Sequence, residues 1–154
     1  MSGDPYVLRV ERLLPVEPGR VFAAWTDPAL LRRWWAAEPD WSCAEAEADV
    51  QVGGHYRLSM RDSQGAVRTV VGEYLEIEPP HLLVYTWAWL SRETNAPGEA
   101  TVVTVRFLPE GTATRVVLEQ RTFAEAADRA LHERGWSGCL DSLEQRVFAQ
   151  PSVG

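Results

Sequence analysis

The feature that most constrains the fold is a long amphipathic helix, which we predict from Thr122 to Phe148. Thr122 and Glu125 match the capping-box pattern, in which two side chains satisfy open backbone N–H groups in the first turn. Apolar residues then recur at helical spacing on one side, namely Trp136, Leu140, Leu143 and Val147. Such a stripe needs an apolar partner surface, which we expect the preceding segments to supply.

Two glycines interrupt this predicted helix, Gly135 and Gly138. Each costs about 1 kcal/mol relative to alanine in a helix interior, so each calls for a compensating role. One hypothesis is close packing against another backbone segment, and the other is room beneath the helix for a ligand. Packing is the favoured interpretation, because isolated helical glycines usually have a packing role.

The segments before the helix predict an antiparallel sheet. The segment from Tyr6 to Leu14 alternates as a strand, and Trp41 to Gln120 contains six more strands without a helical run long enough for a crossover. Between them, Pro18 and the pair Asp27-Pro28 indicate the starts of two short helices. We therefore predict an α+β fold in which about seven strands wrap round one long C-terminal helix.

Two strands carry more specific signals. Gly72, within the strand from Val67 to Ile77, predicts a bulge or bend in a strongly curved sheet. The strand from His81 to Leu90 places large side chains on a single face, namely Leu83, Tyr85, Trp87 and Trp89. Because the sequence contains seven tryptophans, these rings either fill a core or form the wall of a wide apolar cavity.

Length and charge restrict the function classes. The 154 residues fit one domain over 1–154, with an ordered core of about 6–149. The net charge of -7 disfavours nucleic acid and anionic lipid surfaces as partners. No apolar run approaches the roughly 18 residues of a membrane span, and the polar N-terminus lacks a signal-peptide core, so we expect a cytoplasmic protein.

The sequence contains no recognised catalytic motif, metal-ligand spacing or cofactor fingerprint. Cys43 and Cys139 lack the C-x-x-C spacing, which argues against a disulfide framework and a zinc ribbon. His132 and Cys139 lie two helical turns apart, farther than a metal pair normally does. We expect no catalytic residue, metal or cofactor, and whether the protein is an enzyme stays open.

Several short motifs follow one another along nearly the whole chain. They are Trp25-Thr26-Asp27-Pro28, Leu31 with Trp34-Trp35, Gly53-Gly54, Gly72-Glu73 followed by Glu76-Ile77 and Pro79-Pro80, Thr86-Trp87, and His132 with Gly135-Trp136. In this order and spacing the chain resembles the family similar to the C-terminal domain of the activator of the ninety-kilodalton heat-shock-protein ATPase. That family belongs to the START-like (SRPBCC, birch-pollen-allergen type) superfamily, so the resemblance implies the helix-grip fold.

The resemblance also bears on partners. The eukaryotic co-chaperone that gives the family its name carries a separate N-terminal domain, and nothing of the kind precedes Tyr6, so we do not expect a chaperone partner. Stand-alone members look like small ligand-binding or polyketide-cyclase-like proteins. Oligomeric state, monomer or homodimer, is left open.

Three functional hypotheses follow. The first is binding of a small hydrophobic or aromatic molecule in a cavity of at least about 300 Å³ between sheet and helix. The second is a cyclase-like enzyme in which Tyr85 or Arg12 polarises a carbonyl oxygen. The third is a protein-interaction module that uses exposed rings at Trp34-Trp35.

The ligand-binding hypothesis leads to a set of predicted site residues. Arg12, Tyr56 and Tyr85 are the candidates for orienting a ligand, although Arg12 could instead lie at an edge with its guanidinium in solvent. The full candidate set, drawn from the sheet face and the helix stripe, is Arg12, Trp34, Tyr56, Leu58, Met60, Leu83, Tyr85, Trp87, Trp89, Val103, Val105, Phe107, Leu118, Trp136 and Leu140.

Overall fold

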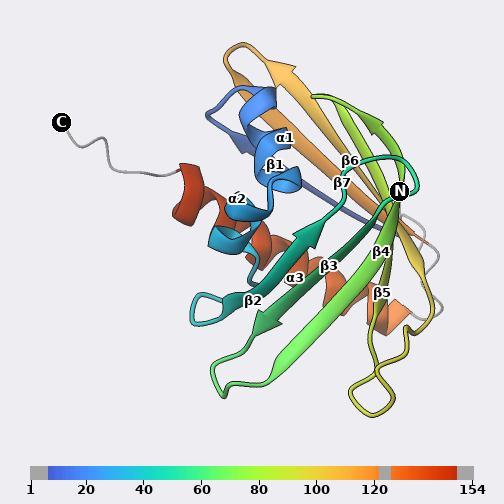
Figure 1. Ribbon diagram of the computed structural model, residues 1–154. Helices are drawn as coiled ribbons and strands as arrows, with labels where there is room; N and C mark the ends of the chain where they lie inside the picture. The colour runs from blue at the N-terminus through green and yellow to red at the C-terminus, as the bar shows by residue number, and fades with distance from the viewer. Residues whose placement is uncertain (1–6, 122–125, 149–154) are drawn as a thin grey trace.

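A computed structural model, which describes residues 7–121 and 126–148, shows a seven-stranded antiparallel sheet curved round a long helix (Figure 1). In chain order the elements are β1 (Leu8–Leu14), α1 (Pro18–Thr26), α2 (Pro28–Trp34), β2 (Ser42–Ala48), β3 (His55–Arg61), β4 (Val67–Glu78), β5 (Leu82–Trp89), β6 (Thr101–Glu110), β7 (Ala113–Arg121), α3 (Ala126–Leu143) and a π-helical turn, η1 (Glu144–Phe148). The predicted helix-grip fold is confirmed.

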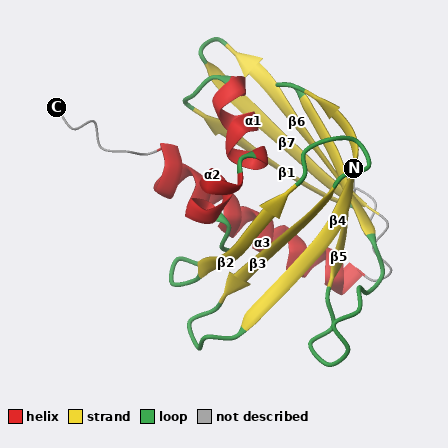
Figure 2. Cartoon of the chain, viewed as in Figure 1, coloured by secondary structure: helices red, strands yellow, loops and turns green. Residues whose placement is uncertain are grey.

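The sheet order is β1-β7-β6-β5-β4-β3-β2, so the first strand lies beside the last. The three α-helices lie on the concave side of the curved sheet (Figure 2). None of the helices in the described segments has the length and apolar character needed to cross a bilayer.

The two short helices form where the sequence predicts them. Pro18 occupies the first turn of α1, where a missing N–H costs nothing, and Pro28 does the same in α2. The side chain of Asp27 caps α2 by accepting a hydrogen bond of 2.9 Å from the backbone N–H of Ala29. These local signals place the chain so that Trp34 and Trp35 enter the core.

The stripe on the long helix is buried as expected, with Trp136, Leu140, Leu143 and Val147 no more than 5% exposed. The predicted capping box of Thr122 and Glu125 lies outside the described residues. This stripe therefore contributes to the core beneath the sheet.

The two helical glycines have different roles. A Cβ at Gly138 would lie 1.9 Å from the carbonyl oxygen of Ala37, so this glycine permits close packing of α3 against the segment after α2. A Cβ at Gly135 would meet nothing within 4 Å, because this position borders a pocket. The packing hypothesis is confirmed for Gly138, whereas Gly135 has no packing role of this kind.

The irregularity predicted near Gly72 is present in β4, a few residues further along the strand. The register of β4 against β5 shifts between Tyr74 and Glu76, while Gly72 itself pairs regularly with Tyr56 of β3. A Cβ at Gly72 would lie 2.5 Å from the ring of Tyr56 and 1.9 Å from the carbonyl oxygen of Thr86. The glycine is therefore needed to make room for the tyrosine ring.

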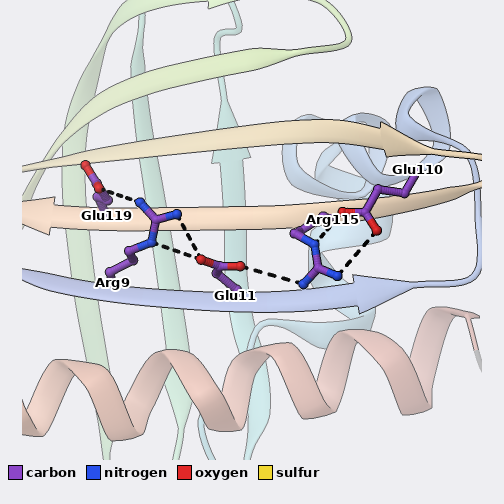
Figure 3. A network of polar contacts seen from close by, with 5 residues as sticks. All are labelled: Arg9, Glu11, Glu110, Arg115 and Glu119. Atoms are coloured by element: carbon purple, nitrogen blue, oxygen red, sulfur yellow. Dashed lines mark hydrogen bonds and ion pairs between the residues drawn. The ribbon is translucent and has the colours of Figure 1, made fainter.

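The outer face of the β1–β7 edge carries a chain of alternating charges (Figure 3). Arg9 contacts Glu11 at 2.9 Å and Glu119 at 3.1 Å, and Arg115 connects Glu11 with Glu110. All five side chains are at least 30% exposed, so solvent screens each pair. The network marks the solvated face of the sheet.

Candidate functional site

Six tryptophans form a continuous cluster in the interior. Trp25 contacts Trp34, Trp34 contacts Trp35, and Trp35 contacts Trp87, with ring centroids 4.9 to 5.7 Å apart. Trp87 also lies 5.0 Å from Trp136 and 5.4 Å from Trp89. Most of these rings pack against one another as a solid filling, which is the arrangement that aromatic pairs favour.

Beneath the centre of the sheet the interior is full. The hollow between the tyrosines and α2 has a volume of only about 10 Å³, enough for about one water molecule at most. It is lined by Trp25, Leu31, Trp35, Tyr56, Leu58, Tyr74, Leu83 and Tyr85. The expected ligand cavity does not lie at this depth.

The tyrosines around this small hollow are buried and protonated. The hydroxyl of Tyr85 accepts a hydrogen bond of 3.2 Å from Trp25 Nε1, and that of Tyr56 donates to the carbonyl oxygen of Thr86. Burial raises the pKa of Tyr74 to about 12 and raises the pKa of Tyr85 and of Tyr56 well above its usual range. These contacts fix the rings within the core.

A larger pocket, of about 410 Å³, lies at the other end of the cluster, between α3, the sheet and the segment after α2. Its wall consists of Trp35, Ala37, Glu38, Trp41, Met60, Arg68, Trp87, Trp89, Leu131, His132, Arg134, Gly135, Trp136 and Cys139. The volume exceeds 300 Å³ and falls in the range of small-molecule sites. We call this the indole pocket, because five of its residues are tryptophans.

The indole pocket is bounded on one side by a hydrogen bond between sheet and helix. Trp89 Nε1 donates to His132 Nε2 at 2.9 Å, and His132 Nδ1 lies 2.7 Å from the carbonyl oxygen of Asp128. Burial lowers the pKa of His132 by more than the nearby Asp128 raises it. His132 is therefore neutral, with its proton on Nδ1, and serves as a fixed acceptor for Trp89.

Two other indoles in this wall lack such a partner. The Nε1 atoms of Trp35 and Trp87 are buried and have no hydrogen-bond acceptor among the described residues. Leaving a buried donor unsatisfied costs about 1 to 3 kcal/mol. By contrast, Trp136 Nε1 donates to Gln120 Oε1 at 2.7 Å, and Gln120 Nε2 donates to Thr101 Oγ1 at 2.7 Å.

The thiol in the pocket wall is not reactive. Burial raises the pKa of Cys139 to about 12, so the thiolate is essentially unpopulated at neutral pH. A nucleophilic role for this residue therefore has no physical support.

A still larger hollow, of about 690 Å³, lies between α3, η1 and the segment after α2. Its wall is mostly polar or charged and includes Glu133, Asp141 and Gln145. This polar surface suits an apolar ligand less well than the indole pocket does.

The structure divides the fifteen predicted site residues into groups. Met60, Trp87, Trp89 and Trp136 line the indole pocket. Tyr56, Leu58, Leu83 and Tyr85 line the small hollow and not the indole pocket. The remaining apolar members are at most 1% exposed and belong to the core, namely Trp34, Val103, Val105, Phe107, Leu118 and Leu140.

Arg12 lines neither the indole pocket nor the small hollow. Its guanidinium contacts Asp141 at 2.8 Å and Glu144 at 2.9 Å, so it joins β1 to the end of the long helix. β1 is an edge strand, as the edge interpretation expects, but the guanidinium is held by two carboxylates and does not extend freely into solvent. Both acidic partners lie in the last turns of the helical segment. The alternation of residues within β1 gives no information about such distant partners.

The exposed rings required by the protein-interaction hypothesis are absent from the described residues at Trp34-Trp35. Trp34 is 0% and Trp35 1% exposed, and Trp34 Nε1 donates to the carbonyl oxygen of Ala24 at 2.9 Å. That hypothesis is wrong as far as it depends on these two side chains.

Sequence reasoning missed part of the pocket wall. Ten wall residues were not among the predicted site residues, namely Trp35, Ala37, Glu38, Trp41, Arg68, Leu131, His132, Arg134, Gly135 and Cys139. One signal was present for Arg68, because it faces Met60 across the β3–β4 pair and therefore stands on the concave face. The wall residues on α3 could not be predicted from the sequence, because their place in the pocket depends on how the helix packs on the sheet.

The curved sheet, the long helix and the hollow between them define a helix-grip domain of START-like type. A family model described as "Activator of Hsp90 ATPase homolog 1-like protein" matches residues 15–147. The chain belongs to this family. A comparison with curated proteins finds no match.

Solved structures support the same fold. A protein from Chromobacterium violaceum is 24% identical, with a TM-score of 0.82 over 96% of this chain and 100% of that chain. The AHSA1 protein from Silicibacter pomeroyi is 26% identical, with a TM-score of 0.79 over 90% and 95% of the two chains. A protein from Arthrobacter aurescens is 22% identical, with a TM-score of 0.81 over 99% and 95%.

Proposed function

We propose that this protein binds a small hydrophobic or aromatic molecule in the indole pocket. The observation that carries the proposal is a hollow of about 410 Å³ whose wall includes five tryptophans and Met60. Flat, polarisable walls of this kind offer large contact area and favour aromatic ligands. The helix-grip fold commonly binds hydrophobic ligands, which agrees with this use of the pocket.

The packing of the remaining core supports this location over the one expected from the strand pattern. The centre of the sheet leaves only about 10 Å³, which excludes a ligand unless the core is rearranged. The indole pocket, in contrast, is bordered by Gly135, whose missing side chain leaves open space. A glycine at this position keeps the space open for a ligand, at a cost of about 1 kcal/mol in helix stability.

The test is a pair of glycine-to-leucine variants. Gly135→Leu should fill the pocket and weaken binding of hydrophobic compounds at least tenfold, as measured by quenching of tryptophan fluorescence and by thermal shift. Gly19→Leu is the matched control, because a Cβ at Gly19 on α1 also meets nothing within 4 Å and lies away from the pocket.

The control variant should bind like the wild type. The proposal fails if Gly135→Leu binds as tightly as Gly19→Leu, or if no compound from a hydrophobic and aromatic library binds the wild-type protein. Native mass spectrometry of freshly purified protein provides an independent search for a co-purifying molecule.

A further inference from the structure

The polar residues of the indole pocket, which we call its rim, are Glu38, Arg68, His132 and Arg134. Their net charge is positive. Arg68 lies directly opposite Met60 in the β3–β4 register, so both side chains stand on the concave face of the sheet. Arg134 belongs to α3, across the pocket from the sheet. Neither guanidinium forms an ion pair or hydrogen bond within residues 7–121 and 126–148.

This local charge contrasts with the rest of the molecule. The protein carries a net charge of -7, yet the rim combines two arginines with one carboxylate, Glu38, beside the neutral His132. Charges farther away than about 8 Å are largely screened at physiological ionic strength. An anion at the rim would therefore respond mainly to Arg68 and Arg134.

The wall of the pocket is also rich in hydrogen-bond donors. Trp35 and Trp87 have indole N–H groups without an acceptor among the described residues, while the acceptor nitrogen of His132 is used by Trp89. Protein atoms cover both of these N–H groups, so neither donor faces the open space of the pocket. The charge preference of the pocket therefore rests on the two guanidinium groups and not on these indoles.

We infer that the ligand is an aromatic carboxylate, an inference that rests on the proposed function of the same pocket. Its apolar ring lies against the indoles, and its carboxylate lies at the rim beside Arg68 and Arg134. The planar wall selects an aromatic body, and the guanidinium groups select the negative charge.

The test compares 2-naphthoate with 2-naphthamide, which have nearly the same shape but differ in charge at pH 7.5. By isothermal titration calorimetry the wild-type protein should bind the carboxylate about tenfold more tightly than the amide, since two exposed ion pairs contribute modestly. Affinity for the carboxylate should fall as sodium chloride is added, whereas affinity for the amide should not.

Three charge-removing variants localise the effect. Arg68→Gln and Arg134→Gln should each weaken binding of the carboxylate about threefold and leave binding of the amide unchanged. Arg106→Gln removes the same charge from an exposed position on β6 that does not border the pocket, so it should alter neither affinity.

The outcomes separate the two proposals. If the amide binds as tightly as the carboxylate, or if Arg106→Gln weakens the carboxylate as much as Arg68→Gln does, the inference is overturned while ligand binding stands. If neither compound nor any other aromatic molecule binds the wild-type protein, the proposed function fails as well.

Discussion

Trp89 of β5 and His132 of α3 are joined by a hydrogen bond of 2.9 Å, in which the indole N–H donates to the imidazole Nε2. The contact requires a neutral imidazole, because a protonated ring has no free acceptor. It ties the sheet to the first half of the long helix at the edge of the indole pocket. The protonation of one residue is thereby coupled to the contact between these two elements.

Acidification should weaken this connection. Because burial lowers the pKa of His132 in the folded protein, the unfolded chain takes up the proton first as pH falls below about 6.5. The free energy of unfolding should therefore decrease from about pH 6.5 down to the lower pKa of the folded state, and no further below it. Urea unfolding at a series of pH values measures this slope.

A histidine variant isolates that contribution from the titration of carboxylates. The difference in unfolding free energy between wild type and His132→Gln should change with pH in this window. A constant difference for His132→Gln would show that the imidazole does not titrate as proposed.

The helical glycines should respond oppositely to alanine. Gly138→Ala places a methyl group against the backbone of Ala37 and should lower the free energy of unfolding by about 1 to 3 kcal/mol. Gly135→Ala meets open space and should raise it by up to about 1 kcal/mol through helix propensity. Chemical denaturation distinguishes the two, and equal effects would contradict the assignment of different roles.

Arg12 should contribute to stability and not to binding. Arg12→Gln removes contacts with Asp141 and Glu144 and should cost about 1 kcal/mol at low salt, with a smaller effect at high salt. Arg9→Gln, in the more exposed network of Figure 3, should cost less than about 0.5 kcal/mol. Loss of ligand affinity in Arg12→Gln would instead favour a position at the pocket mouth.

Removing the hydroxyl of Tyr85 should destabilise the core without changing the pocket. Tyr85→Phe leaves Trp25 Nε1 without its acceptor, which should lower the free energy of unfolding by about 1 to 3 kcal/mol. Ligand affinity should be unchanged, since Tyr85 lines the small hollow and not the indole pocket. A large loss of affinity would show that the two hollows communicate.

Local sequence signals determined most of the architecture. The cap at Asp27 and the alternation along β5 each reflect interactions within a few residues, and both appear where expected. Periodicity identifies the face on which a side chain lies, but it does not indicate how deep the side chain lies or whether space remains in front of it. Tyr85 and Trp87 share a face, yet only Trp87 borders the indole pocket.

The site itself depends on contacts between distant segments. Arg12 meets Asp141 and Glu144 across 129 and 132 residues, and Gly138 meets Ala37 through the packing of α3 on the segment after α2. The depth of the indole pocket follows from this packing. No pattern within a single strand or helix specifies such an arrangement.

The unbroken contact among six tryptophans has an optical consequence. Rings whose centroids lie 4.9 to 5.7 Å from a neighbour are close enough to exchange electronic excitation. Light absorbed by deep rings such as Trp25 can therefore migrate to Trp89 before emission. A quencher seated beside Trp89 would then dim the whole cluster at once, so a single bound molecule would extinguish far more emission than one indole accounts for.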